Sequence, residues 1–71
     1  MTILVRLTAP IRAQHKDGET TALPTGEEIL LTELFTDSYC GYSFGLGAEI
    51  IAKKEDIDGN SQKIGELVRY T

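Results

Sequence analysis

The chain has 71 residues and a mass of 7.8 kDa, so we expect a single small domain spanning residues 1–71 with one modest core. Apolar residues make up 41% and charged residues 25%, which excludes the composition of a disordered chain. Seven Lys and Arg against 11 Asp and Glu give a net charge of −4, a balance that argues against nucleic acid as the partner.

Residues 2–13 predict the first strand. Apolar and polar side chains alternate there with a period of two, which is typical of a strand with one buried face. Proline lacks a backbone N–H, so Pro10 should mark an edge, a bulge or the end of this strand.

The polar segment 14–26 predicts a long loop. It contains the pair Asp17-Gly18, which favours a type I′ hairpin turn because both central residues of that turn need positive φ. The loop could therefore contain a small hairpin.

Residues 27–35 fit two structures. As a strand, the segment would place Glu33 on the same face as Leu31 and opposite Leu34. As a helix, it would begin with the spacing of a capping box and carry a leucine-rich apolar stripe. The short run with polar residues on both sides favours the strand.

The second half of the chain predicts a hairpin over residues 39–54, with its turn at residues 45–47. Residues 55–62 are rich in Asp, Gly, Asn and Ser and predict a turn-rich connection. Residues 63–71 predict a last strand, and a short helix capped at Ser61 is the alternative.

This order of elements predicts a mostly β fold, a five-stranded SH3-like small barrel or sheet. The alternative is an α+β domain with short helices near 26–36 and 61–70. The order resembles the SH3-like architecture only. The chain has no Trp, and the loop 14–26 has no aromatic residue, so the resemblance does not imply recognition of proline-rich peptides.

The sequence offers no constellation of catalytic or metal-binding residues, so we expect neither an enzyme, nor a cofactor, nor a metal site. Asp56, Asp58 and Asn60 alternate as at the start of a calcium loop, but the later ligand positions do not follow, and a turn is expected instead. Cys40 and His15 are a conceivable nucleophile and base, yet nothing nearby supports that role.

The location we expect is the cytoplasm. The longest uncharged stretch, residues 38–48, is too short to span a bilayer, so no membrane association is predicted. The first six residues lack the basic and apolar regions of a signal peptide. Cys40 is the single cysteine and cannot form an internal disulfide. A domain this small could gain stability as a homodimer.

Aromatic residues concentrate in one segment, which holds four of the five in the chain: Phe35, Tyr39, Tyr42 and Phe44. They could be core residues. They could also form an interface, where Tyr is enriched. With the neighbouring acids, the second hypothesis gives a partner-binding site made of Glu33, Phe35, Asp37, Tyr39 and Tyr42.

The function predicted from these features is a non-enzymatic protein-interaction module, or a small regulator or inhibitor, whose acids meet a basic surface of another protein. One alternative is a nucleic-acid-binding barrel that uses Arg6, Arg12, Lys16, Lys53, Lys54 and Lys63. Another is a small subunit of an oligomeric enzyme.

Overall fold

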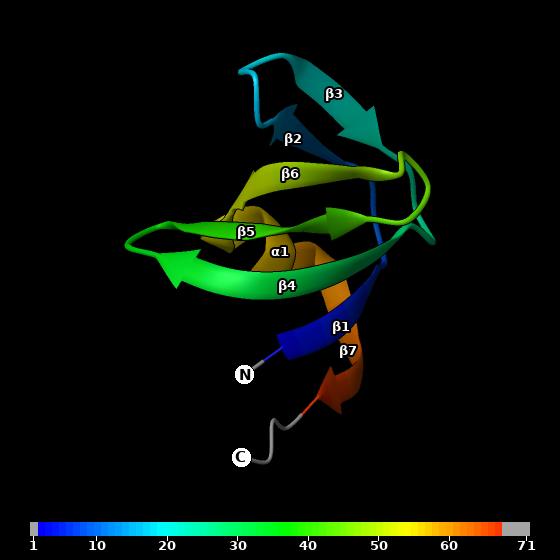
Figure 1. Ribbon diagram of the computed structural model, residues 1–71. Helices are drawn as coiled ribbons and strands as arrows, with labels where there is room; N and C mark the ends of the chain where they lie inside the picture. The colour runs from blue at the N-terminus through cyan, green and yellow to red at the C-terminus, as the bar shows by residue number, and fades with distance from the viewer. Residues whose placement is uncertain (1, 68–71) are drawn as a thin grey trace.

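A computed structural model describes residues 2–67 and shows seven strands and one short helix (Figure 1). The elements in chain order are β1 (Thr2–Leu7), β2 (Ile11–His15), β3 (Thr20–Leu23), β4 (Glu28–Phe35), β5 (Ser38–Ser43), β6 (Ala48–Lys53), α1 (Lys54–Asn60) and β7 (Ser61–Leu67). The prediction of a mostly β chain is confirmed.

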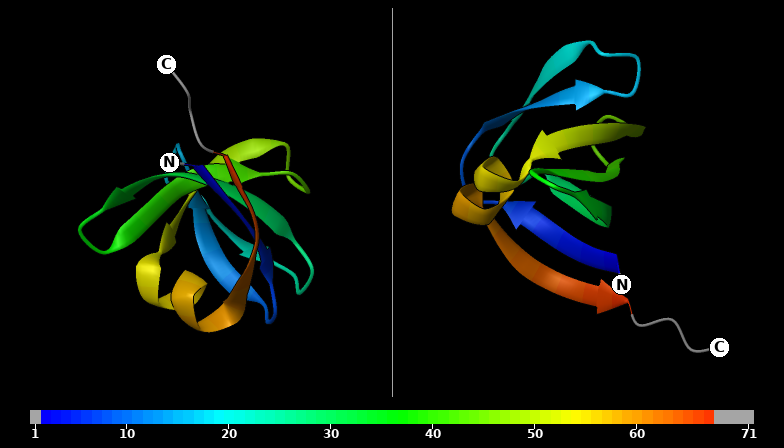
Figure 2. Two further views of the ribbon diagram at one scale, coloured as in Figure 1. Left: turned by 90° about the horizontal axis from the view of Figure 1, so that it is seen from below. Right: turned by 90° about the vertical axis from the view of Figure 1, so that its left-hand side faces the viewer.

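All seven strands belong to one antiparallel sheet in the order β3-β2-β6-β5-β4-β1-β7. The sheet is strongly curled, and α1 lies at one end of the curl (Figure 2). The helix contacts the neighbouring strands β2 and β6 and also β7, which is the opposite edge of the sheet, so it bridges the two halves of the curled sheet.

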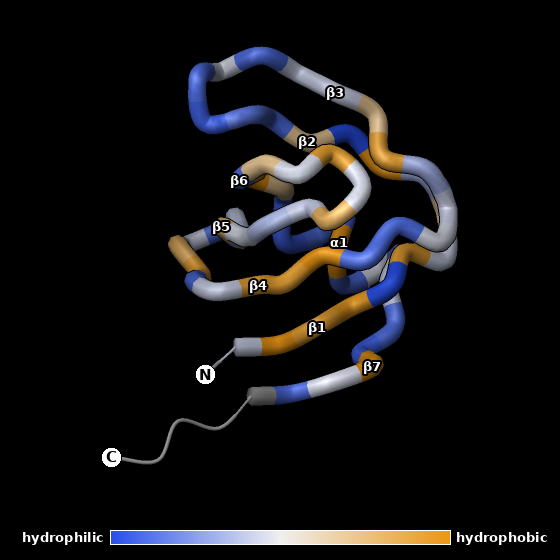
Figure 3. Tube along the Cα trace, turned by 45° about the vertical axis from the view of Figure 1, so that its right-hand side comes forward, coloured by the Kyte–Doolittle hydropathy of each residue, from blue (hydrophilic) through white to orange (hydrophobic). Residues whose placement is uncertain are grey.

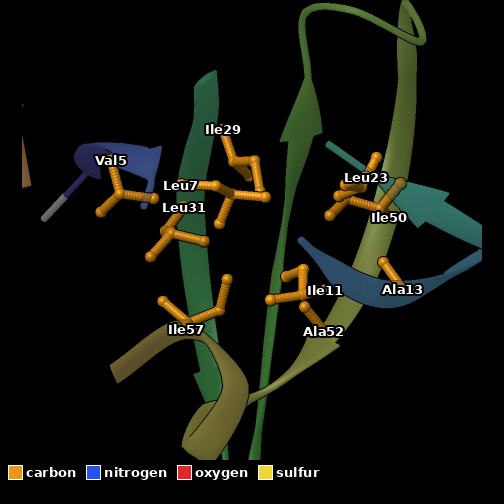
Figure 4. Packing of buried hydrophobic residues seen from close by; sticks show 10 residues of the cluster. All are labelled: Val5, Leu7, Ile11, Ala13, Leu23, Ile29, Leu31, Ile50, Ala52 and Ile57. Carbon is orange, nitrogen blue, oxygen red and sulfur yellow. The ribbon is translucent and has the colours of Figure 1, made fainter. Parts of the chain in front are cut away.

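The core lies on the concave face of the sheet. Side chains with a period of two supply it, because alternate residues of a strand point to the same face. The buried apolar residues are Val5, Leu7, Ile11, Ala13, Leu23, Ile29, Leu31, Ile50, Ala52 and Ile57 (Figure 4). Apolar residues also follow one another along β1 and β4, the strands that run through the lower half of the molecule in Figure 3.

The segment 2–13 forms two strands where one was predicted. β1 ends at Leu7 and β2 begins at Ile11, so Pro10 lies in the connection between them. The first strand therefore ends near the proline, as the missing N–H requires, and the chain continues into a different part of the sheet. Together with β3, this division raises the strand number from the expected five to seven.

The polar segment 14–26 contains the turn and the second strand of a hairpin, β2–β3, whose first strand begins earlier, at Ile11, and the turn is not of type I′. Among the described residues only glycines have positive φ, and Gly18 has a φ of 98°. The Gly18 N–H donates to the His15 carbonyl at 2.9 Å, and the His15 N–H donates to the Glu19 carbonyl at 2.7 Å. This is a type I turn over Lys16 and Asp17 followed by a glycine bulge, the usual three-residue hairpin loop.

Residues 28–35 and 61–67 are strands, so the alternative with helices near 26–36 and 61–70 is wrong over the described residues. Positions 68–71, which belong to the predicted last element, lie outside them. The predicted hairpin over 39–54 is confirmed as β5–β6, with Gly47 at a φ of 65° in its turn.

The one helix occupies residues 54–60, where the sequence predicted a turn-rich connection. Glu55 and Asp56 in its first turn favour the positive end of the helix dipole. Asn60 Nδ2 donates to the Asp56 carbonyl at 2.9 Å, and Ser61 Oγ donates to the Ile57 carbonyl. Ile57 is 2% exposed and fixes this short helix to the core.

Candidate functional site

A β-bulge in β4 determines which side chains of this strand face outward. Leu31 pairs with Gly41, and the next paired residue is Glu33, opposite Cys40, so Thr32 is the extra residue. The Thr32 hydroxyl donates to the Cys40 carbonyl at 3.2 Å across the bulge. A bulge of this kind changes the face on which the following residues lie.

The bulge moves Glu33 away from the face that simple alternation predicts. Leu31 is buried in the core, and a regular strand would place Glu33 beside it. Because Thr32 is inserted, Glu33 instead shares the convex face with Cys40, and Phe35 follows two positions later on the same face. The prediction that Glu33 and Leu31 share a face is therefore wrong.

The convex face of β4, β5 and β6 carries a shallow hollow of about 360 Å³, which we call the outer hollow. Its principal lining residues are Glu33, Phe35, Cys40, Tyr42, Glu49 and Ile51. Register explains the grouping, because Cys40 lies between Glu33 and Ile51, and Tyr42 pairs with Glu49. Three neighbouring strands thus place these side chains next to one another.

Aromatic rings stand at both ends of the outer hollow. Phe35 is 54% exposed and Tyr42 is 37% exposed. The Tyr42 ring also meets Phe44 edge to face, with 5.5 Å between the ring centroids. Large apolar side chains in this arrangement leave a surface that another molecule could cover.

The turn next to Tyr42 is held by a carboxylate. Ser43 Oγ donates to Glu27 Oε2 at 2.6 Å, and the Gly45 N–H donates to the same oxygen at 2.8 Å. The Leu46 N–H donates to Ser43 Oγ at 3.3 Å. These bonds tie the β5–β6 turn to the start of β4, which fixes one end of the outer hollow.

The charges around the outer hollow are not all neutralised. Lys16 Nζ lies 3.1 Å from Glu49 Oε2, in a pair that solvent reaches on both sides. Glu33 forms no salt bridge with any residue in the range 2–67. Its carboxylate therefore gives the hollow an acidic flank.

Of the five predicted site residues, the structure brings three together. Glu33, Phe35 and Tyr42 all line the outer hollow. Tyr39 lies on the opposite face, where it packs against the core, as the alternation with Tyr42 predicts. Asp37 is in the β4–β5 turn, and its carbonyl accepts a hydrogen bond from the Lys54 N–H at 2.7 Å.

Tyr39 belongs to a separate polar cluster with Asp58 and Lys54. The Tyr39 hydroxyl donates to Asp58 Oδ1 at 3.2 Å, and Lys54 Nζ donates to Asp58 Oδ2 at 2.5 Å. Burial raises the pKa of Tyr39, with a further contribution from the Asp58 charge. The hydrogen bond from Lys54 lowers the pKa of Asp58 and raises that of Lys54. This cluster attaches α1 to β5.

Three of the principal lining residues were not part of the predicted site: Cys40, Glu49 and Ile51. Cys40 is half-buried and lines the hollow. Alternation along 48–53 places Glu49 and Ile51 on one face. Their position opposite Tyr42 and Cys40 depends on the strand register, which the sequence does not give.

The basic residues named for a nucleic-acid site are divided among several carboxylates. Arg6, Lys16, Lys54 and Lys63 form salt bridges with Glu28, Glu49, Asp58 and Glu66. Arg12 and Lys53 line a second hollow that also contains Asp56. The described cations therefore do not form a uniformly basic face.

Within residues 2–67, no three or more His, Cys, Asp or Glu side chains are grouped so that they could hold a metal ion. The same residues contain no helix long and apolar enough to cross a membrane.

Fold and site together define a small, mostly β domain with an aromatic and acidic hollow on its convex face. Compared with family models, curated proteins and solved structures, the chain matches none.

Proposed function

We propose that this chain is a non-enzymatic protein-interaction module that binds its partner through the outer hollow. The observation that carries the proposal is the position of Phe35 and Tyr42, two exposed aromatic side chains at the ends of one hollow. Interfaces are commonly centred on aromatic side chains that become buried on binding. The acidic flank at Glu33 favours a partner with a basic surface.

We also infer that the curled sheet is a variant of the SH3-like architecture. In this interpretation the five strands of the SH3-like architecture correspond to β1, β4, β5, β6 and β7. The hairpin β2–β3 then occupies the long loop between the first two of these strands. The short helix before the last strand and the meander β4–β5–β6 support the correspondence. The architecture identifies no ligand, so the binding proposal depends on the outer hollow alone.

The proposal can be tested with a variant that removes both rings, Phe35→Ala with Tyr42→Ala. The tagged wild-type protein and the variant are used to capture partners from a lysate of the native source. Truncating central interface aromatics costs about 2 kcal/mol or more, so we expect retention of a partner to fall by about 30-fold or more. Circular dichroism and thermal unfolding establish that the variant is folded.

A matched control is Ile64→Ala on β7. Ile64 is 37% exposed, the same fraction as Tyr42, but it is on a different strand, outside the outer hollow. This variant should retain the partner at the wild-type level. Equal retention by the double variant and the wild type would refute the proposed site, and nucleic acid in place of a protein would refute the proposed class of partner.

A further inference from the structure

The ligand chemistry of the outer hollow follows from the neighbours on β4. Glu33 and Phe35 are two positions apart on the same face of one strand, so a carboxylate and an aromatic ring lie side by side. Half-buried Cys40 and Ile51 form an apolar base next to them. These neighbours favour a ligand that combines an apolar stem with a cationic end.

The electrostatics favour a cation over a second copy of this chain. The chain carries a net charge of −4, so two copies repel each other at long range. Glu33 has no salt-bridge partner within residues 2–67, so a cation there displaces no internal ion pair. The Lys16–Glu49 pair on the far flank is exposed, and such pairs contribute little.

We propose that the outer hollow binds an arginine side chain in an extended, basic segment of the partner. The guanidinium donates to the Glu33 carboxylate and stacks on the Phe35 ring, while the stem and the neighbouring partner residue cover Cys40 and Tyr42. Arginine fits better than lysine because its planar group stacks on rings and makes two parallel hydrogen bonds to a carboxylate. This inference rests on the proposed function and specifies the chemistry of the partner.

The probe is a blocked pentapeptide with arginine at its centre and threonine and glycine on each side. Matched peptides carry citrulline, which has nearly the same shape without the charge, or lysine. Binding is followed through the amide shifts of the ¹⁵N-labelled protein. We expect saturable shifts at Glu33, Phe35, Cys40 and Tyr42, with affinity for the arginine peptide about fivefold higher than for the citrulline peptide.

The variant Glu33→Gln keeps the size of the side chain and removes its charge. It should reduce the affinity for the arginine peptide toward that for the citrulline peptide, because only the stacking on Phe35 then distinguishes the two peptides. The control is Glu19→Gln, which removes an exposed acid in the β2–β3 loop and should leave the affinity unchanged. Equal binding of the arginine and citrulline peptides, or no effect of Glu33→Gln, would overturn the inference.

The two proposals can fail separately. If partner capture depends on Phe35 and Tyr42 but the arginine peptide gives no shifts in the hollow, the interaction module stands and the arginine assignment is wrong. If capture is independent of both rings, the proposed function itself is wrong. Shifts in the hollow that depend on protein concentration alone, together with a dimer mass in solution, would assign this face to a second copy.

Discussion

Ser43 is the one polar side chain among the described residues that is fully buried. Its hydroxyl donates to Glu27 Oε2, and it also accepts a bond from the Leu46 N–H. The sequence shows Ser43 only as a small residue before a glycine-rich turn, and Glu27 is 16 positions away. Local patterns carry no information about such a pair, because its geometry depends on the register of β4 against β5.

Replacing Ser43 with Ala should lower the free energy of unfolding by about 1–2 kcal/mol, since a bond to a charged acceptor is lost at a buried position. Urea denaturation measures the change. The control is Ser38→Ala, because the Ser38 hydroxyl makes only a long 3.4 Å bond to its exposed neighbour Asp37. A Ser43→Ala protein as stable as Ser38→Ala would show that the Glu27 bond does not stabilise the turn.

The Tyr39–Asp58–Lys54 cluster predicts a dependence of stability on pH. The hydrogen bond from Lys54 lowers the pKa of Asp58 in the folded protein. The ionised Asp58 therefore stabilises the fold above its unfolded pKa, near 3.8, and this stabilisation is lost as the pH falls through the lower pKa of the folded protein. The pKa values of Tyr39 and Lys54 are raised, so their contributions are present below about pH 10 and are lost above it.

The difference in unfolding free energy between the wild type and Asp58→Asn should therefore be largest between about pH 5 and 9 and shrink below pH 4. Urea denaturation at a series of pH values measures it. Tyr39→Phe isolates the tyrosine contribution, because it removes the hydroxyl and keeps the ring against the core. A difference that stays constant from pH 2 to pH 7 would contradict the assigned ion pair.

At the scale of elements, the bulge in β4 separates two stretches of regular pairing between β4 and β5. On one side of Thr32, Leu31 pairs with Gly41, and on the other side Glu33 pairs with Cys40, the residue adjacent to Gly41. Without Thr32 these two pairs would follow each other directly. Deleting Thr32 should therefore give a regular strand in which Glu33 and Phe35 keep the convex face.

We expect the deletion variant to fold. Its free energy of unfolding should fall by about 1 kcal/mol or less, because the hydrogen bond of the Thr32 hydroxyl is lost. Cross-strand NMR contacts between Glu33 and Cys40 measure the register. Thr32→Ala is the control that removes the hydroxyl and keeps the inserted residue. Contacts that place Glu33 against the core would contradict this account of the bulge.

The sequence predicted the strands with clear alternation and missed the bulge and the helix. Alternation along 27–35 is irregular because Thr32 interrupts it, so periodicity placed Glu33 on the wrong face. Residues 54–60 contain Asp, Gly and Asn, which favour turns. Tertiary burial of Ile57 outweighs that local preference, and no pattern within seven residues reveals it.

At the scale of the whole molecule, β5 is the central strand, and β3 and β7 are the two edges. The sequence predicted a mostly β fold but could not give this order, since any strand with one apolar face can pair with several others. The split between Tyr39 and Tyr42 was predictable from alternation. The neighbours of Tyr42 on β4 and β6 were not.

The sheet order predicts a gradient of local stability. Hydrogen-bonded amides of β4 and β5 should exchange with solvent at least about tenfold more slowly than those of β3 and β7, because edge strands open without disrupting the centre. Exchange followed by NMR at neutral pH measures the rates, with the β2–β3 turn as an internal reference for fast exchange. Equal protection across all seven strands would contradict the observed order.

The pairing of β1 with β7 has a consequence for the synthesis of this protein. β1 can pair with β4 as soon as the first half of the chain is made, but its other side has no neighbour until β7 follows α1. Contacts between such distant segments slow folding. A nascent or truncated chain that stops before residue 61 therefore presents an open strand edge, a ready site for aggregation or for strand exchange with another copy.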